Sequence, residues 1–110
     1  MEAPSVISNL EKLLSEGKES ALLRFSLGNE YFKRSEIWVA VFQLKRALEL
    51  DPNYSAAWKL LAAALASGGV LNEALSTCRR GIEVAQQRGD HQAAKEMMVF
   101  ARRLEKKLSS

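Results

Sequence analysis

Few side chains in this sequence have the types and spacings that a chemical reaction requires. The single cysteine, Cys78, and the single histidine, His91, have no neighbours at the spacing of metal ligands or of a nucleophile and its base. Gly68-Gly69 lacks the lysine and the preceding strand of a phosphate-binding loop. No paired carboxylates suggest acid–base catalysis. We therefore expect no enzyme activity, no metal and no cofactor, with Cys78 as a small buried side chain and His91 in solvent.

A cluster of large apolar side chains is better suited to binding than to catalysis. Trp38 and Phe42 are one helical turn apart, and with Val39 they would form one contiguous patch. We call these three residues the Trp38 patch. An exposed patch of this kind marks an interface, and aromatic side chains are preferred interface anchors. The patch is either an interface, with a second copy in a homodimer or with another protein, or it is covered by the N-terminal helix, and the sequence leaves these alternatives open.

The composition fits one folded domain over residues 1–110. Of the 110 residues, 47% are apolar and 26% are charged, as in ordinary globular proteins. The net charge of +3 arises at the C-terminal end, in residues 102–107. This basic end either complements a helix dipole or binds nucleic acid or another anion, which is the weaker alternative. No secretory or membrane-spanning pattern occurs, and a lone cysteine fits a reducing compartment, so we expect a cytoplasmic protein without a membrane partner.

The elements that must position these residues are helices. Apolar residues recur at helical spacing over almost the whole chain, which predicts an all-α fold. Ser20, Ser35 and Asp90 are candidate N-caps, because their side-chain oxygens can accept hydrogen bonds from a first helical turn. Gly28 would let a neighbouring helix approach closely. The expected elements are an N-terminal helix, two helical hairpins and a closing helix, at residues 5–16, 21–54, 55–88 and 90–108.

The two expected hairpins repeat each other with a period of about 34 residues. The repeated residues are Leu27, Gly28, Tyr31, Ala40, Ala47 and Pro52 in the first copy and Trp58, Leu61 and Ala74 in the second. They resemble the signature of the tetratricopeptide repeat (TPR) family, W-x-x-L-G-x-x-Y followed by alanines and a proline. Arg24 departs from this signature, which has tryptophan at its position. The resemblance implies antiparallel hairpins stacked as a short solenoid, with a closing helix because a hairpin cannot bury its apolar face alone.

The family resemblance also implies a function and a binding surface. The first helices of the hairpins would line a concave groove that binds a peptide segment of another protein, as in an adaptor or scaffold. Asn29 suits this role, since its amide can both donate to and accept from an extended backbone. Cations in the groove favour an acidic segment with an apolar anchor. The groove positions carried over to this chain are Leu22, Phe25, Asn29, Phe32, Lys33, Lys59, Ala63, Lys95, Val99 and Arg102.

Overall fold

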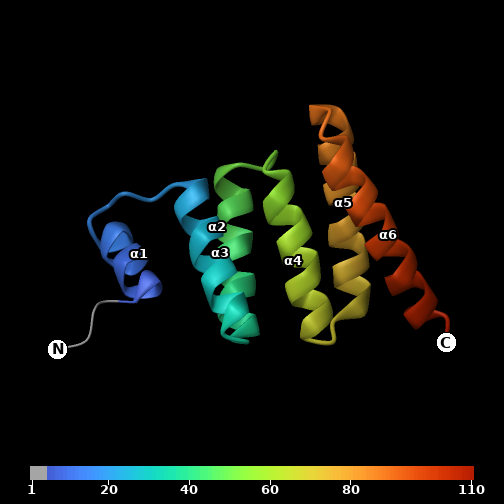
Figure 1. The fold of residues 1–110 in the computed structure, drawn as a ribbon, viewed down its shortest axis with the longest axis horizontal. Helices are drawn as coiled ribbons and strands as arrows, with labels where there is room; N and C mark the ends of the chain where they lie inside the picture. The colour runs from blue at the N-terminus through green and yellow to red at the C-terminus, as the bar shows by residue number, and fades with distance from the viewer. Residues whose placement is uncertain (1–4) are drawn as a thin grey trace.

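The structure is a computed structural model that describes residues 5–110, and within that range it is helical without any strand. Figure 1 shows a row of antiparallel helices with α1 and α6 at its opposite ends. Among residues 5–110, no helix is both long enough and apolar enough to span a bilayer. The helices are α1 (Val6–Ser15), α2 (Ala21–Lys33), α3 (Ile37–Leu50), α4 (Ser55–Ser67), α5 (Leu71–Arg88) and α6 (His91–Leu108). The predicted all-α fold is confirmed.

Consecutive helices pair as hairpins, α2 with α3 and α4 with α5, and the two hairpins meet where α3 packs against α4. The first helices of the pairs also touch one another, because α4 contacts both α2 and α6. The backbones of α3 and α5 lie farther apart and are joined by the ion pair between Lys45 and Glu73. Figure 1 shows α3 behind α2 and α5 behind α6. The fold therefore has two layers, and we call the side formed by the nearer layer the α2–α4–α6 face.

The core lies between the two layers and uses the repeated apolar positions. Leu27, Leu44 and Leu65 are fully buried, and α6 adds the buried side chain of Met97. A Cβ atom on Gly28 would lie 2.7 Å from Cγ of Leu44, which confirms the predicted close approach of two helices at this glycine. Because α6 packs along α5, it covers the apolar end that the second hairpin would otherwise expose.

The N-terminal helix α1 packs only against α2. Its buried residue is Ile7, and its Glu11 accepts a hydrogen bond of 2.8 Å from the Tyr31 hydroxyl. It stands before α2 as α3 stands before α4, in the place of the second helix of a preceding hairpin. Since a helix in that place does not reach α3, which carries the Trp38 patch, the alternative that the N-terminal helix covers this patch is wrong.

Two of the predicted helix starts are confirmed by hydrogen bonds. The Ser20 hydroxyl accepts a bond of 3.1 Å from the backbone N–H of Leu23, at the start of α2. The Asp90 carboxylate accepts one of 3.2 Å from the N–H of Ala93, at the start of α6. Each bond satisfies an amide that has no partner within its helix.

Ser35 does not cap α3, contrary to the prediction. It has a φ of 61°, and its N–H donates to the carbonyl of Phe32 at 2.9 Å, while the N–H of Glu36 donates to that of Tyr31 at 3.0 Å. This pair of bonds is a Schellman motif, which ends α2. Gly69 has the same place after α4, with a φ of 81°. Because Ser35 ends one helix in the left-handed conformation, it is not placed to begin the next one.

Candidate functional site

Two adjoining pockets lie in the α2–α4–α6 face. The first pocket, between α2 and α4, has a volume of about 250 Å³ and is lined by Phe25, Asn29, Ala56, Lys59, Leu60 and Ala63. The second pocket, between α4 and α6, has a volume of about 400 Å³ and is lined by Lys59, Ala62, Ala63, Cys78, Glu96, Met97, Val99, Phe100 and Arg103. Since Lys59 and Ala63 line both pockets, the hollow continues across α4.

Several residues that the sequence assigned to the groove come together in these pockets. Phe25 and Asn29 lie one helical turn apart on α2, and Lys59 and Ala63 occupy the equivalent places on α4. Val99 of α6 lines the second pocket. The repeat period therefore places equivalent side chains of successive hairpins along one line of the face.

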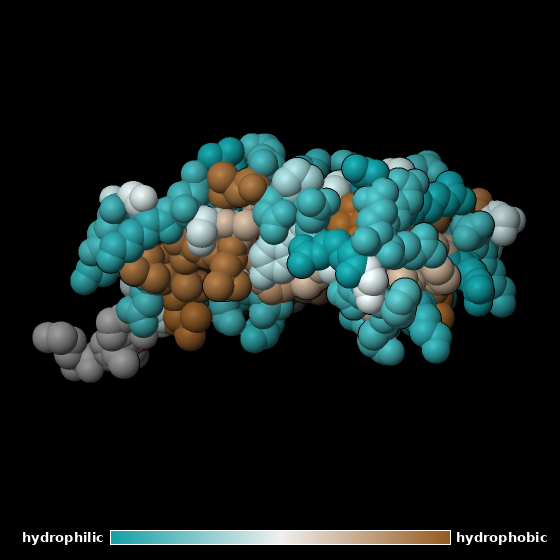
Figure 2. All heavy atoms as spheres, turned by 90° about the horizontal axis from the view of Figure 1, so that it is seen from above, coloured by the Kyte–Doolittle hydropathy of each residue, from teal (hydrophilic) through white to brown (hydrophobic). Residues whose placement is uncertain are grey.

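The other residues of that set lie outside the two pockets. Leu22 is 64% exposed and lines a third pocket, of about 300 Å³, between α2 and α1. Figure 2 shows apolar atoms gathered at this end of the molecule, at the left of the view. Phe32 is half-buried against the core, and Lys33 forms an ion pair within α2. Lys95 and Arg102 are exposed on α6 and line neither the first nor the second pocket.

The sequence reasoning did not assign Glu96, Phe100 and Arg103 to the site, although all three line the second pocket. They are spaced four and three residues apart, so they share one face of α6. That face lies about one residue round the helix from the expected positions Lys95 and Arg102. The turn before α6 breaks the repeat period, so the period does not fix the register of this helix.

The rim shared by the two pockets carries an ion pair. The Lys59 ammonium contacts the Glu96 carboxylate, which also accepts a hydrogen bond of 3.1 Å from the Gln92 amide. Hydrogen bonds first from Lys59 and then from Gln92 lower the pKa of Glu96 below its ordinary value. Arg103 forms no ion pair with any residue of the described part of the chain.

An aromatic contact holds the wall of the first pocket. The rings of Phe25 and Tyr54 are stacked, with centroids 4.9 Å apart and planes inclined by 29°. Both side chains are half-buried, so each keeps some surface toward solvent. Because stacking fixes the Phe25 ring, the pocket keeps an apolar wall without a partner.

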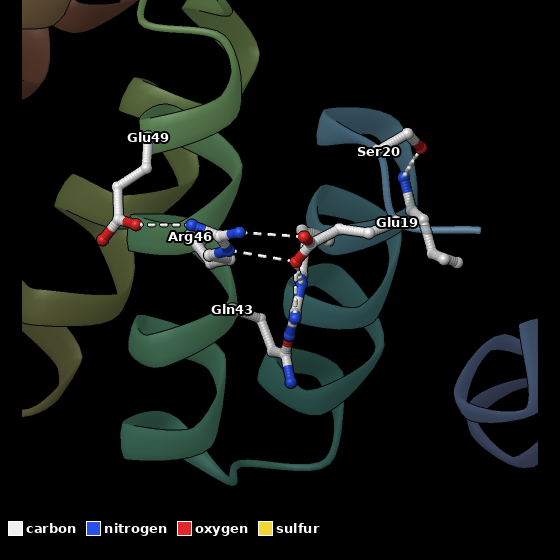
Figure 3. Close-up of polar contacts among 7 residues, drawn as sticks. Glu19, Ser20, Gln43, Arg46 and Glu49 are labelled. Carbon is white, nitrogen blue, oxygen red and sulfur yellow. Dashed lines mark hydrogen bonds and ion pairs between the residues drawn. The ribbon is translucent and has the colours of Figure 1, made fainter. Parts of the chain in front are cut away.

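A network of charged side chains ties the loop before α2 to α2 and α3 (Figure 3). Glu19 accepts hydrogen bonds of 2.8 Å from Nε of Arg24 and 2.8 Å from a terminal nitrogen of Arg46. Arg24 also donates to the buried amide oxygen of Gln43 at 2.9 Å. The bonds from Arg46 and then from Arg24 lower the pKa of Glu19 to about 2. These bonds join parts of one hairpin, so we interpret the network as structural.

The Trp38 patch is exposed on α3. Trp38 is 57% exposed, Phe42 is 62% exposed, and Val39 lies between them. One edge of the Trp38 ring is held in place, because a Cβ atom on Gly68 would lie only 2.9 Å from it. The patch is therefore apolar, partly fixed and open to solvent in the described structure.

The chain is similar in sequence and in fold to known helical repeat proteins. The profile of the family described as "Tetratricopeptide repeat" matches residues 40–98, which is more than half of the chain. A TPR repeat-containing protein of Pseudomonas aeruginosa is 44% identical over 92% of this chain and 96% of its own length. A Bordetella parapertussis protein of known solution structure is 39% identical, with a TM-score of 0.84 over 97% of this chain and 91% of its own.

A further solved structure shows the same fold at lower sequence identity. It is a tetratricopeptide repeat domain protein of Salinibacter ruber, with a TM-score of 0.74 and 24% identity, over 79% of this chain and 88% of that one. The family profile begins at Ala40 in α3 and ends at Met98 in α6, so it covers the junction of the two hairpins and the part of the second pocket that α4 and α5 supply. The chain therefore belongs to the tetratricopeptide repeat family, whose fold serves as a protein–protein interaction module.

Proposed function

We propose that this protein is an adaptor or scaffold that binds an extended peptide segment of a partner along the α2–α4–α6 face. The observation that carries the proposal is the pair of adjoining pockets, which lie one repeat apart and share Lys59 and Ala63. A partner segment lying across α4 could place successive side chains in the two pockets. The proposed setting is the cytoplasm, which suits the lone, buried thiol of Cys78.

The side chains of the face indicate what such a segment would contain. The stacked Phe25 ring offers an apolar wall, and Asn29 beside it can donate to and accept from a peptide backbone. Lys59 offers a cation between the two pockets. These groups favour an extended segment with an apolar anchor and an acidic side chain.

Selection from a displayed library of random peptides on the immobilised protein tests this proposal. The double variant Asn29→Ala with Lys59→Ala should bind the selected peptides about tenfold more weakly, because it removes one backbone contact and one charge contact. Trp38→Glu is the matched control, because it changes an exposed residue of α3, outside the α2–α4–α6 face. If the double variant binds every selected peptide with unchanged affinity, the face is not the binding surface.

A second candidate function is self-association through the Trp38 patch. It is favoured by the exposure of Trp38 and Phe42 and by the position of α1, which leaves the patch uncovered. Light scattering after size-exclusion chromatography over a wide concentration range should then give a dimer, and Trp38→Glu should give a monomer. A wild-type monomer at all concentrations would end this candidate.

A further inference from the structure

The two pockets of the face occupy equivalent places but differ at the floor. One repeat period takes Phe25 to Lys59 and Leu44 to Cys78. Leu44 packs against Gly28 and does not line the first pocket. The shorter Cys78 lines the second pocket, which is larger, at about 400 Å³ against about 250 Å³. The larger pocket therefore lies over the smaller of the two side chains, and Cys78 itself is fully buried beneath it.

The second pocket combines an apolar interior with a charged rim. Val99 and Phe100 supply apolar surface to it, above the buried side chain of Met97. At the rim, Lys59 is paired with Glu96, whereas Arg103 has no ion-pair partner among residues 5–110. Two cations and one carboxylate leave the rim with a net positive charge. A single carboxylate on a partner would complement this charge.

We propose that the second pocket is the specificity subsite of the face, and that it takes a large apolar side chain whose neighbour in the partner is an acidic residue. The partner's carboxylate replaces Glu96 as the ion-pair partner of Lys59. This inference rests on the proposed function and adds to it the identity of the motif.

The exchange of carboxylates is favoured by the weakness of the internal pair. The side chains of Lys59 and Glu96 are 50% and 40% exposed, and ion pairs at such exposure contribute little to stability. Glu96 keeps the amide of Gln92 as a hydrogen-bond donor when Lys59 leaves it. Burial of the apolar side chain then supplies affinity, and the two cations supply the preference for an acidic neighbour.

Four short peptides with blocked ends test the motif. They are identical except for one adjacent pair, which is Phe-Asp, Phe-Asn, Ala-Asp or Ala-Asn, and each is titrated into the isotope-labelled full chain. The Phe-Asp peptide should shift the backbone amide signals of Ala63, Cys78 and Met97. It should bind about fivefold or more tightly than each of the other three, because only it supplies both groups.

Two variants of the protein test the floor and the rim separately. Cys78→Leu places a longer side chain under the pocket without the glycine that makes room for Leu44 in the first hairpin, so it should weaken Phe-Asp binding about tenfold by reducing the volume of the pocket. Glu96→Gln should strengthen it about twofold or more by removing the competing carboxylate. Glu83→Gln is the matched control, since its partner Arg80 lies on α5 outside both pockets. Thermal unfolding of each variant shows whether the fold is intact.

The outcomes separate this inference from the proposed function. Amide shifts confined to Phe25, Asn29 and Ala56 would overturn the subsite and leave binding on the face in place. Equal affinity for all four peptides, or Phe-Asp affinity unchanged by Glu96→Gln in a folded protein, would also overturn it. If none of the peptides shifts any signal of the face, the subsite is wrong, and the library selection decides the proposed function by itself.

Discussion

At the place where Trp58 stands in the second hairpin, the first hairpin has Arg24. Trp58 fills this place with an indole ring whose N–H donates to the carbonyl of Pro52 at 2.8 Å. Arg24 fills it with a guanidinium group that donates to Glu19 and Gln43. One position of the repeat therefore accepts either a ring or a set of charged hydrogen bonds. The two hairpins should accordingly respond differently to acid, because only the first depends on a carboxylate at this place.

The hairpins also differ in the pair of residues at which their two helices come closest. The first opposes Gly28 to Leu44, and one period later the second opposes Ala62 to Cys78. A smaller residue on one helix is matched by a larger one on the other, since interiors are close-packed. The sizes of the two facing residues are therefore coupled, and a change at one position should alter the effect of a change at the other.

Gly28→Ala is the change with the largest expected effect on this comparison. The added Cβ atom would lie 2.7 Å from Cγ of Leu44, so this buried side chain or the helix that carries it must shift. We expect a net loss of about 1–2 kcal/mol in the free energy of unfolding, after allowance for the better helix propensity of alanine. Urea unfolding of the variant and the wild type measures this difference in free energy.

A second substitution sharpens the same prediction. Leu44→Cys copies the second hairpin, and in the double variant with Gly28→Ala it should relieve the clash. The two changes should then be less destabilising together than their separate costs imply, by about 1 kcal/mol. Strict additivity would contradict the account of paired positions.

Acid should weaken the first hairpin through Glu19. Its pKa is about 2 in the folded protein against an ordinary value of 4.5, because Arg46 and Arg24 donate to it. A lowered folded pKa gives stability that is present above about pH 4.5 and is lost as the pH falls toward 2. Glu19→Gln should therefore be less stable than wild type at neutral pH, and the difference should shrink between these pH values.

The control for this pH profile is Glu83→Gln, which breaks the ion pair with Arg80 on the surface of the second hairpin. The pH profile of this variant shows what the loss of a surface ion pair does without any change to the Glu19 network. Equal pH profiles for the two variants would show that the Glu19 network has no special role.

The smallest expected effect is at the turn between α2 and α3. Ser35 has the left-handed conformation that Gly69 has after α4, and side chains other than glycine are disfavoured there. Ser35→Gly should stabilise the protein by about 0.5–1 kcal/mol, as measured by urea unfolding. Gly69→Ser should cost a similar amount, and a loss of stability in Ser35→Gly would contradict this explanation.

The parts of the fold that local chemistry decides could be predicted from the sequence. The repeat period located the two hairpins, and the capping residues Ser20 and Asp90 gave two helix starts. Ser35 was misread because serine suits both an N-cap and, less often, a left-handed position. The packing of α3 against α2 decides which of these two roles the serine takes.

The site was harder to predict than the fold. Phe25, Asn29, Lys59 and Ala63 follow the repeat period, so their common line on the face was foreseeable. The side of α6 that faces the second pocket depends on a turn that breaks the period, so the role of Glu96 could not be found by shifting the repeat.

The most direct test of binding on the α2–α4–α6 face is a titration of the isotope-labelled protein with a library-selected peptide, followed by its amide signals. The account predicts shifts at Asn29, Lys59, Ala63 and Val99, with little change at Phe42. Shifts at Phe42 and its neighbours on α3, with none along the face, would contradict it.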